Sequence, residues 1–157
     1  MKNQNFLRKL CGEGIIQVQE PNVDLASAYF EKARKSLSSA KATASIGSLE
    51  DATALSYYAM YHALTGLLFR AGIKCENHTA SILLLHEVFE QNNDSILHAK
   101  KERIDKQYYV DFAVTQDEVK KSITSAEEFL ALISDILAKL TETRVAELNK
   151  KAKKLLK

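Results

Sequence analysis

The sequence predicts an all-α fold, in which four main helices form an up-and-down antiparallel bundle and short helices lie at the chain ends. The 157 residues include only five glycines and one proline, so few positions interrupt a helix. Long stretches repeat apolar residues at intervals of three and four, as helices with one buried face do. The stretch 52–70 is apolar on nearly every side, which is typical of the central helix of a bundle.

The composition is that of an ordinary globular protein, with 46% hydrophobic and 27% charged residues. The net charge of +2 is too small to indicate a polyanionic partner by itself. Cys11 and Cys75 have no metal-binding or redox spacing, so we expect two unpaired thiols in a reducing compartment. No signal peptide and no stretch of membrane-spanning length is recognisable. We therefore expect a cytoplasmic protein without a membrane partner.

The first strong helix begins near Asn22 or Asp24, since either side chain can cap it, and it ends at Gly47. Ser48 opens the central helix, which ends before Gly72. A line of small residues along this helix allows a neighbouring backbone to approach closely. This line consists of Ala52, Ser56, Ala59, Ala63 and Gly66. Other lines carry tyrosine and histidine, whose polar tips need partners where they are buried.

A polar loop is expected over residues 73–77, followed by a third helix that Asn77 or Thr79 caps. A more polar fourth helix covers about residues 95–109. After a connection, the last main helix begins at Thr115, which forms a capping box with Glu118. The chain thus divides into an arm or short helix, the helical bundle and a basic helical extension, at residues 1–22, 23–140 and 141–157. The lysines of the extension either contact nucleic acid or an acidic partner, or form a solvated helix end.

Two segments taken together resemble the HEPN domain of higher eukaryotes and prokaryotes. The first, residues 57–79, has paired tyrosines, a Tyr-His-Ala triplet, an apolar run and a final His-Thr pair. The second, residues 102–133, has an arginine five residues before a tyrosine, a Val-Thr pair and Ala-Glu-Glu-Phe along the last helix. The resemblance spans roughly residues 24–137.

This resemblance implies an up-and-down helical bundle that usually pairs into a homodimer. Prokaryotic members of the family are often encoded beside a minimal nucleotidyltransferase, as toxin–antitoxin-like pairs. Many members are ribonucleases that use an arginine followed four to six residues later by a histidine, at the dimer cleft. Others lack that pair and are thought to be binding or accessory modules.

The sequence departs from the ribonuclease pattern at the histidine. Arg103 matches the arginine of the family, but Tyr108, Tyr109 and Val110 occupy the places where the histidine would fall. A phenol titrates near about 10 and an imidazole near about 6.5, so a tyrosine is a poor proton acceptor at neutral pH. We therefore expect a non-catalytic nucleotide-binding or accessory module that acts with a nucleotidyltransferase. The alternative is a metal-independent ribonuclease toxin with its site at the homodimer cleft, in which His62 or His78 supplies the imidazole.

Three groups of residues are candidates for binding a nucleotide or RNA. The first joins Arg103 to Tyr108 and Tyr109, where the guanidinium would bind a phosphate, unless it pairs with a neighbouring carboxylate. The second is Tyr58 with His62 on the central helix, which is either a polar notch or a hydrogen-bonded core pair. The third is a phosphate-binding loop or a plain solvated turn, formed by Arg70, Lys74 and His78.

Neither a metal nor a cofactor is expected. His86 and His98 stand apart from each other, and no carboxylate lies at the spacing of a zinc ligand beside them. No other pattern in the sequence indicates a cofactor.

Overall fold

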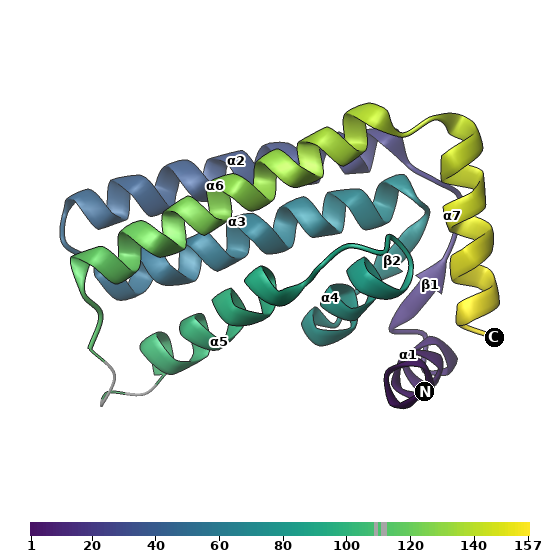
Figure 1. The fold of residues 1–157 in the computed structure, drawn as a ribbon, viewed down its shortest axis with the longest axis horizontal. Coiled ribbons are helices and arrows are strands. Elements are labelled where there is room, and N and C mark those ends of the chain that lie inside the picture. The colour runs from purple at the N-terminus through teal and green to yellow at the C-terminus, as the bar shows by residue number, and fades with distance from the viewer. Residues whose placement is uncertain (109, 111–112) are drawn as a thin grey trace.

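The computed structural model describes residues 1–108, 110 and 113–157, without the side chains of residues 107 and 108 (Figure 1). Within these residues it has seven helices and a two-stranded sheet, which confirms the predicted all-α class. The elements are α1 (Lys2–Gly12), β1 (Ile16–Val18), α2 (Val23–Ser45), α3 (Leu49–Arg70), β2 (Ile73–Cys75), α4 (His78–Glu87), α5 (Asp94–Tyr108), α6 (Gln116–Lys139) and α7 (Glu142–Leu155).

Helix α3 is the centre of the bundle, as its sequence predicted. It packs against α2, α6, α5 and α4, and Figure 1 shows α2, α3 and α6 running side by side. The side chains of Tyr57, Met60 and Leu64 on α3 are fully buried. The predicted line of small residues lets α2 approach, because a Cβ at Gly66 would lie 2.9 Å from the carbonyl oxygen of Ala26.

The helix boundaries follow local capping chemistry. The side chains of Asn22, Asn77 and Thr115 accept hydrogen bonds from backbone N–H groups at the starts of α2, α4 and α6, which settles the alternatives for the first two. Ser48 instead donates to the carboxylate of Asp51, at 2.7 Å, and makes no capping bond to the backbone. Of the predicted capping box, the hydrogen bond from the Glu118 backbone N–H to the Thr115 hydroxyl is present. The Glu118 side chain pairs with Lys106.

The polar loop expected over residues 73–77 is in part a strand, and this prediction was wrong. Strand β2 pairs antiparallel with β1, in a register that sets Ile16 opposite Cys75 and Val18 opposite Ile73. Three residues are too few to show the alternation of a strand, and the partner strand lies far away in the chain. The pairing buries Ile16 and Ile73 almost completely.

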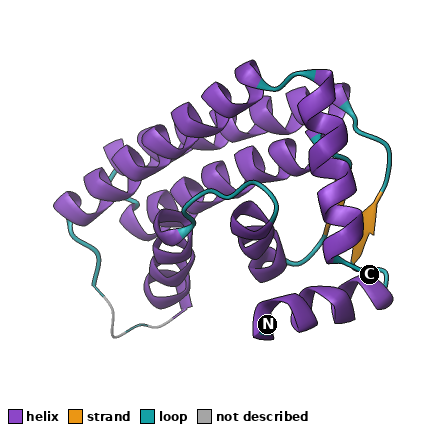
Figure 2. Ribbon diagram, turned by 45° about the vertical axis from the view of Figure 1, so that its right-hand side comes forward, coloured by secondary structure: helices purple, strands orange, loops and turns teal. Residues whose placement is uncertain are grey.

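The two terminal segments pack together against one end of the bundle. Figure 2 shows the helix that ends at the C-terminus lying beside the strand, above the helix that begins at the N-terminus. Leu7 and Leu10 of α1 and Leu148 and Ala152 of α7 belong to the same buried cluster as α3. Most apolar residues of the basic extension are thus buried, whereas most of its lysines are exposed.

Candidate functional site

Aromatic side chains of the central helix α3 meet side chains from α4 and α5. Helix α3 contributes Tyr57, Tyr58 and Tyr61, α4 contributes His78 at its first position, and α5 contributes Arg103. We call these five residues the Arg103–His78 cluster. They meet because α4 and α5 both pack on α3, although the residues lie up to 46 positions apart in sequence (103 − 57).

Arg103 lies over the tyrosines of the central helix. Its guanidinium carbon is 5.1 Å from the ring centroid of Tyr58 and 5.6 Å from that of Tyr57, within the range of cation–π attraction. The sequence grouped Arg103 with Tyr108 and Tyr109. The side chain of Tyr108 and the whole of Tyr109 lie outside the described residues. The aromatic neighbours of Arg103 in the described chain therefore come from α3.

His78 is held between two tyrosines of α3. Its Nδ1 atom lies 2.7 Å from the hydroxyl oxygen of Tyr57, and its ring stacks on Tyr61 with centroids 3.8 Å apart and planes 10° apart. The cap provided by Asn77 fixes where α4 begins, and this directs the first helical side chain toward α3.

The Tyr57 hydroxyl and His78 Nδ1 share one hydrogen bond, whose direction goes with the tautomer of the imidazole. Burial, together with Tyr61, raises the pKa of the Tyr57 hydroxyl well above its usual range, although Arg103 opposes the shift. The hydroxyl therefore keeps its proton at neutral pH, and His78 Nδ1 is its hydrogen-bond partner in the described chain. Burial and the charges of Arg103 and Lys100 lower the pKa of His78, so the ring is neutral. A neutral ring that accepts at Nδ1 carries its proton on Nε2.

His62 lies next to the cluster and not inside it. Its ring centroid is 6.2 Å from that of Tyr58 and 6.4 Å from that of Tyr29 on α2. Its Nδ1 atom is buried and has no hydrogen-bond partner among the described residues. Burial, and then the charge of Lys32, lower the pKa of His62 to about 4. Tyr58 and His62 are thus neighbours on α3, as the sequence indicated, and the imidazole is neutral at physiological pH.

The three residues of the predicted group Arg70, Lys74 and His78 contact different partners. Arg70 Nη2 lies 2.6 Å from Glu142 Oε1 on α7, and Lys74 Nζ lies 3.1 Å from Glu76 Oε1. His78 faces α3 instead. The first two side chains are therefore engaged in ion pairs, and only the third belongs to the cluster.

The sequence matches the HEPN domain family over residues 26–137, which is well over half of the chain. The chain belongs to the HEPN domain family. No curated protein matches it. The matched segment of this HEPN protein runs from α2 to the end of α6 and contains the whole Arg103–His78 cluster. Membership supports a nucleotide-binding or ribonuclease-like module. In the described part of the HEPN protein, no helix has the length and apolar character to cross a membrane.

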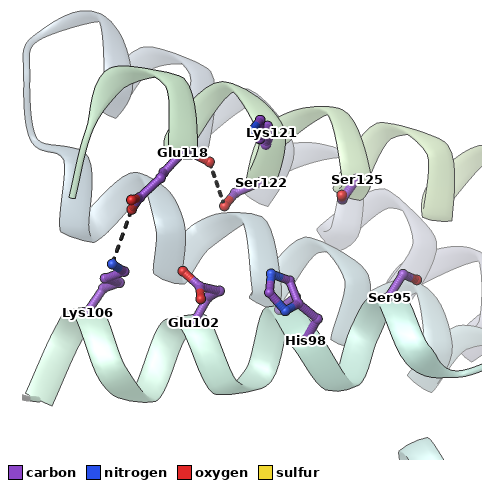
Figure 3. A pocket seen from close by; sticks show the side chains of 9 residues that line it. Ser95, His98, Glu102, Lys106, Glu118, Lys121, Ser122 and Ser125 are labelled. Atoms are coloured by element: carbon purple, nitrogen blue, oxygen red, sulfur yellow. Dashed lines mark hydrogen bonds and ion pairs between the residues drawn. The ribbon is translucent and has the colours of Figure 1, made fainter. Parts of the chain in front are cut away.

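A second polar feature of the HEPN protein is a groove between α5 and α6 (Figure 3). It has a volume of about 240 Å³, and its lining includes His98, Glu102 and Lys121. At one end Lys106 Nζ lies 3.1 Å from Glu118 Oε2 and donates to the carbonyl oxygen of Ala113. Glu102 also points into this groove. The described residues include no group of three potential metal ligands.

Sequence reasoning missed several residues of the HEPN site. Tyr57 and Tyr61 were not among the predicted binding residues, and they hold the imidazole of His78. Thr79 was considered only as a helix cap, yet its hydroxyl accepts a hydrogen bond of 2.7 Å from Lys100 Nζ. The available signal was the Asn77 cap, because a residue directly after a cap lies on a defined face of its helix.

Proposed function

We propose that this HEPN protein is a non-catalytic module that binds the phosphate of a nucleotide or of RNA at the Arg103–His78 cluster. The single observation that carries the proposal is the 2.7 Å hydrogen bond between the Tyr57 hydroxyl and His78 Nδ1, in which we assign the hydroxyl as the donor. With the hydroxyl as donor, the imidazole of His78 carries its N–H group at Nε2 and its basic nitrogen is engaged. The cluster then offers hydrogen-bond donors and no free proton acceptor.

Hydrogen-bond donors and aromatic rings suit the binding of a phosphate and a base. The planar guanidinium of Arg103 has five N–H donors and matches the geometry of phosphate oxygens. The Nε2–H group of His78 adds a neutral donor, and the aromatic rings of Tyr58 and His62 provide surfaces for a base. Cleavage without a metal instead needs a group that takes the proton of a 2′-hydroxyl near neutral pH. The Tyr57 hydroxyl keeps its own proton, and His62 Nδ1 is shielded from solvent.

The alternative function is a metal-independent ribonuclease toxin with its site at a homodimer cleft. The observation in its favour is that His78 and Arg103 share one cluster although they come from different helices. Such an enzyme requires His78 to give up its bond to Tyr57 when RNA binds, so that the imidazole accepts the proton.

The two functions are separated by assays of binding and cleavage on the same RNA. We expect AMP or short single-stranded RNA to bind in calorimetry, Arg103→Ala to weaken binding about tenfold or more, and no cleavage. Arg144→Ala, which changes an exposed arginine of α7, serves as the matched control. Cleavage that both Arg103→Ala and His78→Ala abolish, and that Arg144→Ala leaves intact, would establish the ribonuclease instead.

We also propose that the protein forms a homodimer and works in the cytoplasm of a prokaryote with a minimal nucleotidyltransferase, in a toxin–antitoxin-like pair. The support for this assembly is the family resemblance of the sequence. A small nucleotidyltransferase gene next to this one, and co-purification of the two products, are the expected observations. Sedimentation at low concentration tests the dimer, and a monomer at all concentrations would contradict it.

A further inference from the structure

A second cation, Lys100, lies beside Arg103 on the same face of α5. The two residues are three positions apart, so their side chains project to the same side of the helix. Lys100 Nζ donates to the hydroxyl of Thr79 over 2.7 Å, and Thr79 follows His78 directly in α4. The charges of both cations act on the His78 ring and lower its pKa. Lys100 and Arg103 therefore approach the imidazole together.

Lys100 has no carboxylate within ion-pair distance among the described residues, and it is only partly exposed. An ammonium group has three donors, and Thr79 accepts from one of them. Glu76, an acidic residue shortly before α4, is paired with Lys74. The remaining donors of Lys100 are thus available to an anion that lies beside His78 and Arg103.

The charge of this arrangement discriminates between two kinds of phosphate. A phosphate monoester carries about −1.5 to −2 charges at neutral pH, because its second pKa is about 6. A phosphodiester within a nucleic-acid strand carries a single negative charge. Two fixed positive charges and a neutral N–H donor match the monoester better than the diester.

We propose that the cluster, extended by Lys100 and Thr79, recognises the terminal phosphate monoester of a nucleotide or RNA end and selects it over an internal phosphodiester. This inference rests on the proposed nucleotide-binding function and names its ligand. Arg103 binds either phosphate, whereas Lys100 responds to the additional charge of the monoester. Thr79 positions the ammonium group and does not itself read the ligand.

The test compares ligands that share a base and a sugar. We would titrate the full chain with 5′-AMP, 3′-AMP and 3′,5′-cyclic AMP, whose phosphate is a diester, and measure affinity by calorimetry. We expect at least one monoester to bind about tenfold tighter than the cyclic diester. Lys100→Met should remove that preference by weakening the monoester alone, while Lys101→Met, on the neighbouring exposed lysine, should preserve it. Comparing 5′-AMP with 3′-AMP separates the two possible ends.

A second pair of ligands separates failure of the monoester inference from failure of the proposed nucleotide-binding function. A short single-stranded RNA is titrated with its ends as phosphates and again with its ends as hydroxyls. Equal affinity for the two RNAs, or an equal loss for both with Lys100→Met, overturns the monoester inference and leaves RNA binding intact. Absence of binding by all of these ligands overturns both. Melting curves confirm that Lys100→Met and Lys101→Met are folded.

Discussion

At the scale of single residues, the site is defined by which side chains keep their protons. Tyr57 is fully buried and holds its proton, and we assign its hydroxyl as the donor in the 2.7 Å hydrogen bond to His78 Nδ1. Burial raises the pKa of the tyrosine and lowers that of the histidine, so both side chains are neutral at physiological pH. This arrangement decides whether the imidazole beside Arg103 offers a proton or a lone pair to a ligand.

The proton position in His78 is directly measurable. In ¹⁵N spectra of the wild-type protein at neutral pH, we expect His78 to be protonated on Nε2 and unprotonated on Nδ1. Tyr57→Phe removes the hydroxyl at little cost in shape, so the ring should become a mixture of tautomers and stability should fall by about 1 kcal/mol. Tyr58→Phe is the control, because the bond to His78 comes from Tyr57. A wild-type His78 protonated on Nδ1 would contradict the proposed donor role.

His62 makes the stability of the fold depend on pH. Its pKa falls from about 6.5 in the unfolded chain to about 4 in the folded protein, so the unfolded state binds protons first on acidification. Above about pH 6.5 His62 is neutral in both states and does not change the free energy of unfolding. That free energy then decreases as the pH falls toward 4, because only the unfolded state takes up the proton. Between pH 7.5 and 5 we expect His62 to account for a loss on the order of 1 kcal/mol, after allowance for its partial exposure. Urea denaturation at both pH values should show a smaller loss for His62→Gln; an unchanged loss would assign the effect elsewhere.

At the scale of elements, Gly72 marks the join between α3 and β2. Its φ of +76° lies in the left-handed region, and a Cβ there would lie 2.2 Å from Gln19 O and 2.5 Å from Asn149 Nδ2. Gly47, which ends α2, has a φ of +81° but open space around it. We expect Gly47→Ala to cost about 1 kcal/mol for the backbone conformation alone. Gly72→Ala should lower the free energy of unfolding by about 3 kcal/mol or more in urea denaturation. Equal losses for the two variants would mean that Gln19 and Asn149 can move away from the added methyl group.

The same elements show what the sequence determines locally and what it leaves to packing. Asn22 and Asn77 cap their helices through groups within three residues, so these boundaries were predictable. The β1–β2 pair joins residues that are far apart in the chain and too few to show a pattern. For the same reason the sequence grouped His78 with its loop neighbours Arg70 and Lys74. Its actual partners, Tyr57 and Tyr61, depend on how α4 packs on α3.

At the scale of the whole molecule, the HEPN domain carries an addition made from both ends of the chain. Helix α1, strand β1 and helix α7 lie outside the matched residues 26–137 and pack together at one end of the bundle. Arg8 Nε donates to Leu155 O, and Arg70 pairs with Glu142, so α7 is bonded both to α1 and to α3. The addition also supplies β1, the partner of β2, and β2 leads directly to Asn77 and His78. The addition thus supports the chain segment that presents the imidazole.

Asn149 joins α7 to two other segments of the chain. Its buried Nδ2 group donates to the carbonyl oxygens of Gln19 and Ala71, each at 2.9 Å, and so connects α7 to the end of β1 and the end of α3. Asn149→Ala leaves two carbonyl oxygens without this donor, and we expect a loss of about 1–3 kcal/mol in urea denaturation. Asn149→Asp should cost more, because a carboxylate accepts hydrogen bonds and would face two other acceptors. Lys150→Ala, on the exposed neighbour, should change little. If Asn149→Ala and Lys150→Ala behaved alike, α7 would be held by its apolar residues alone, and the two hydrogen bonds would add nothing measurable to the fold.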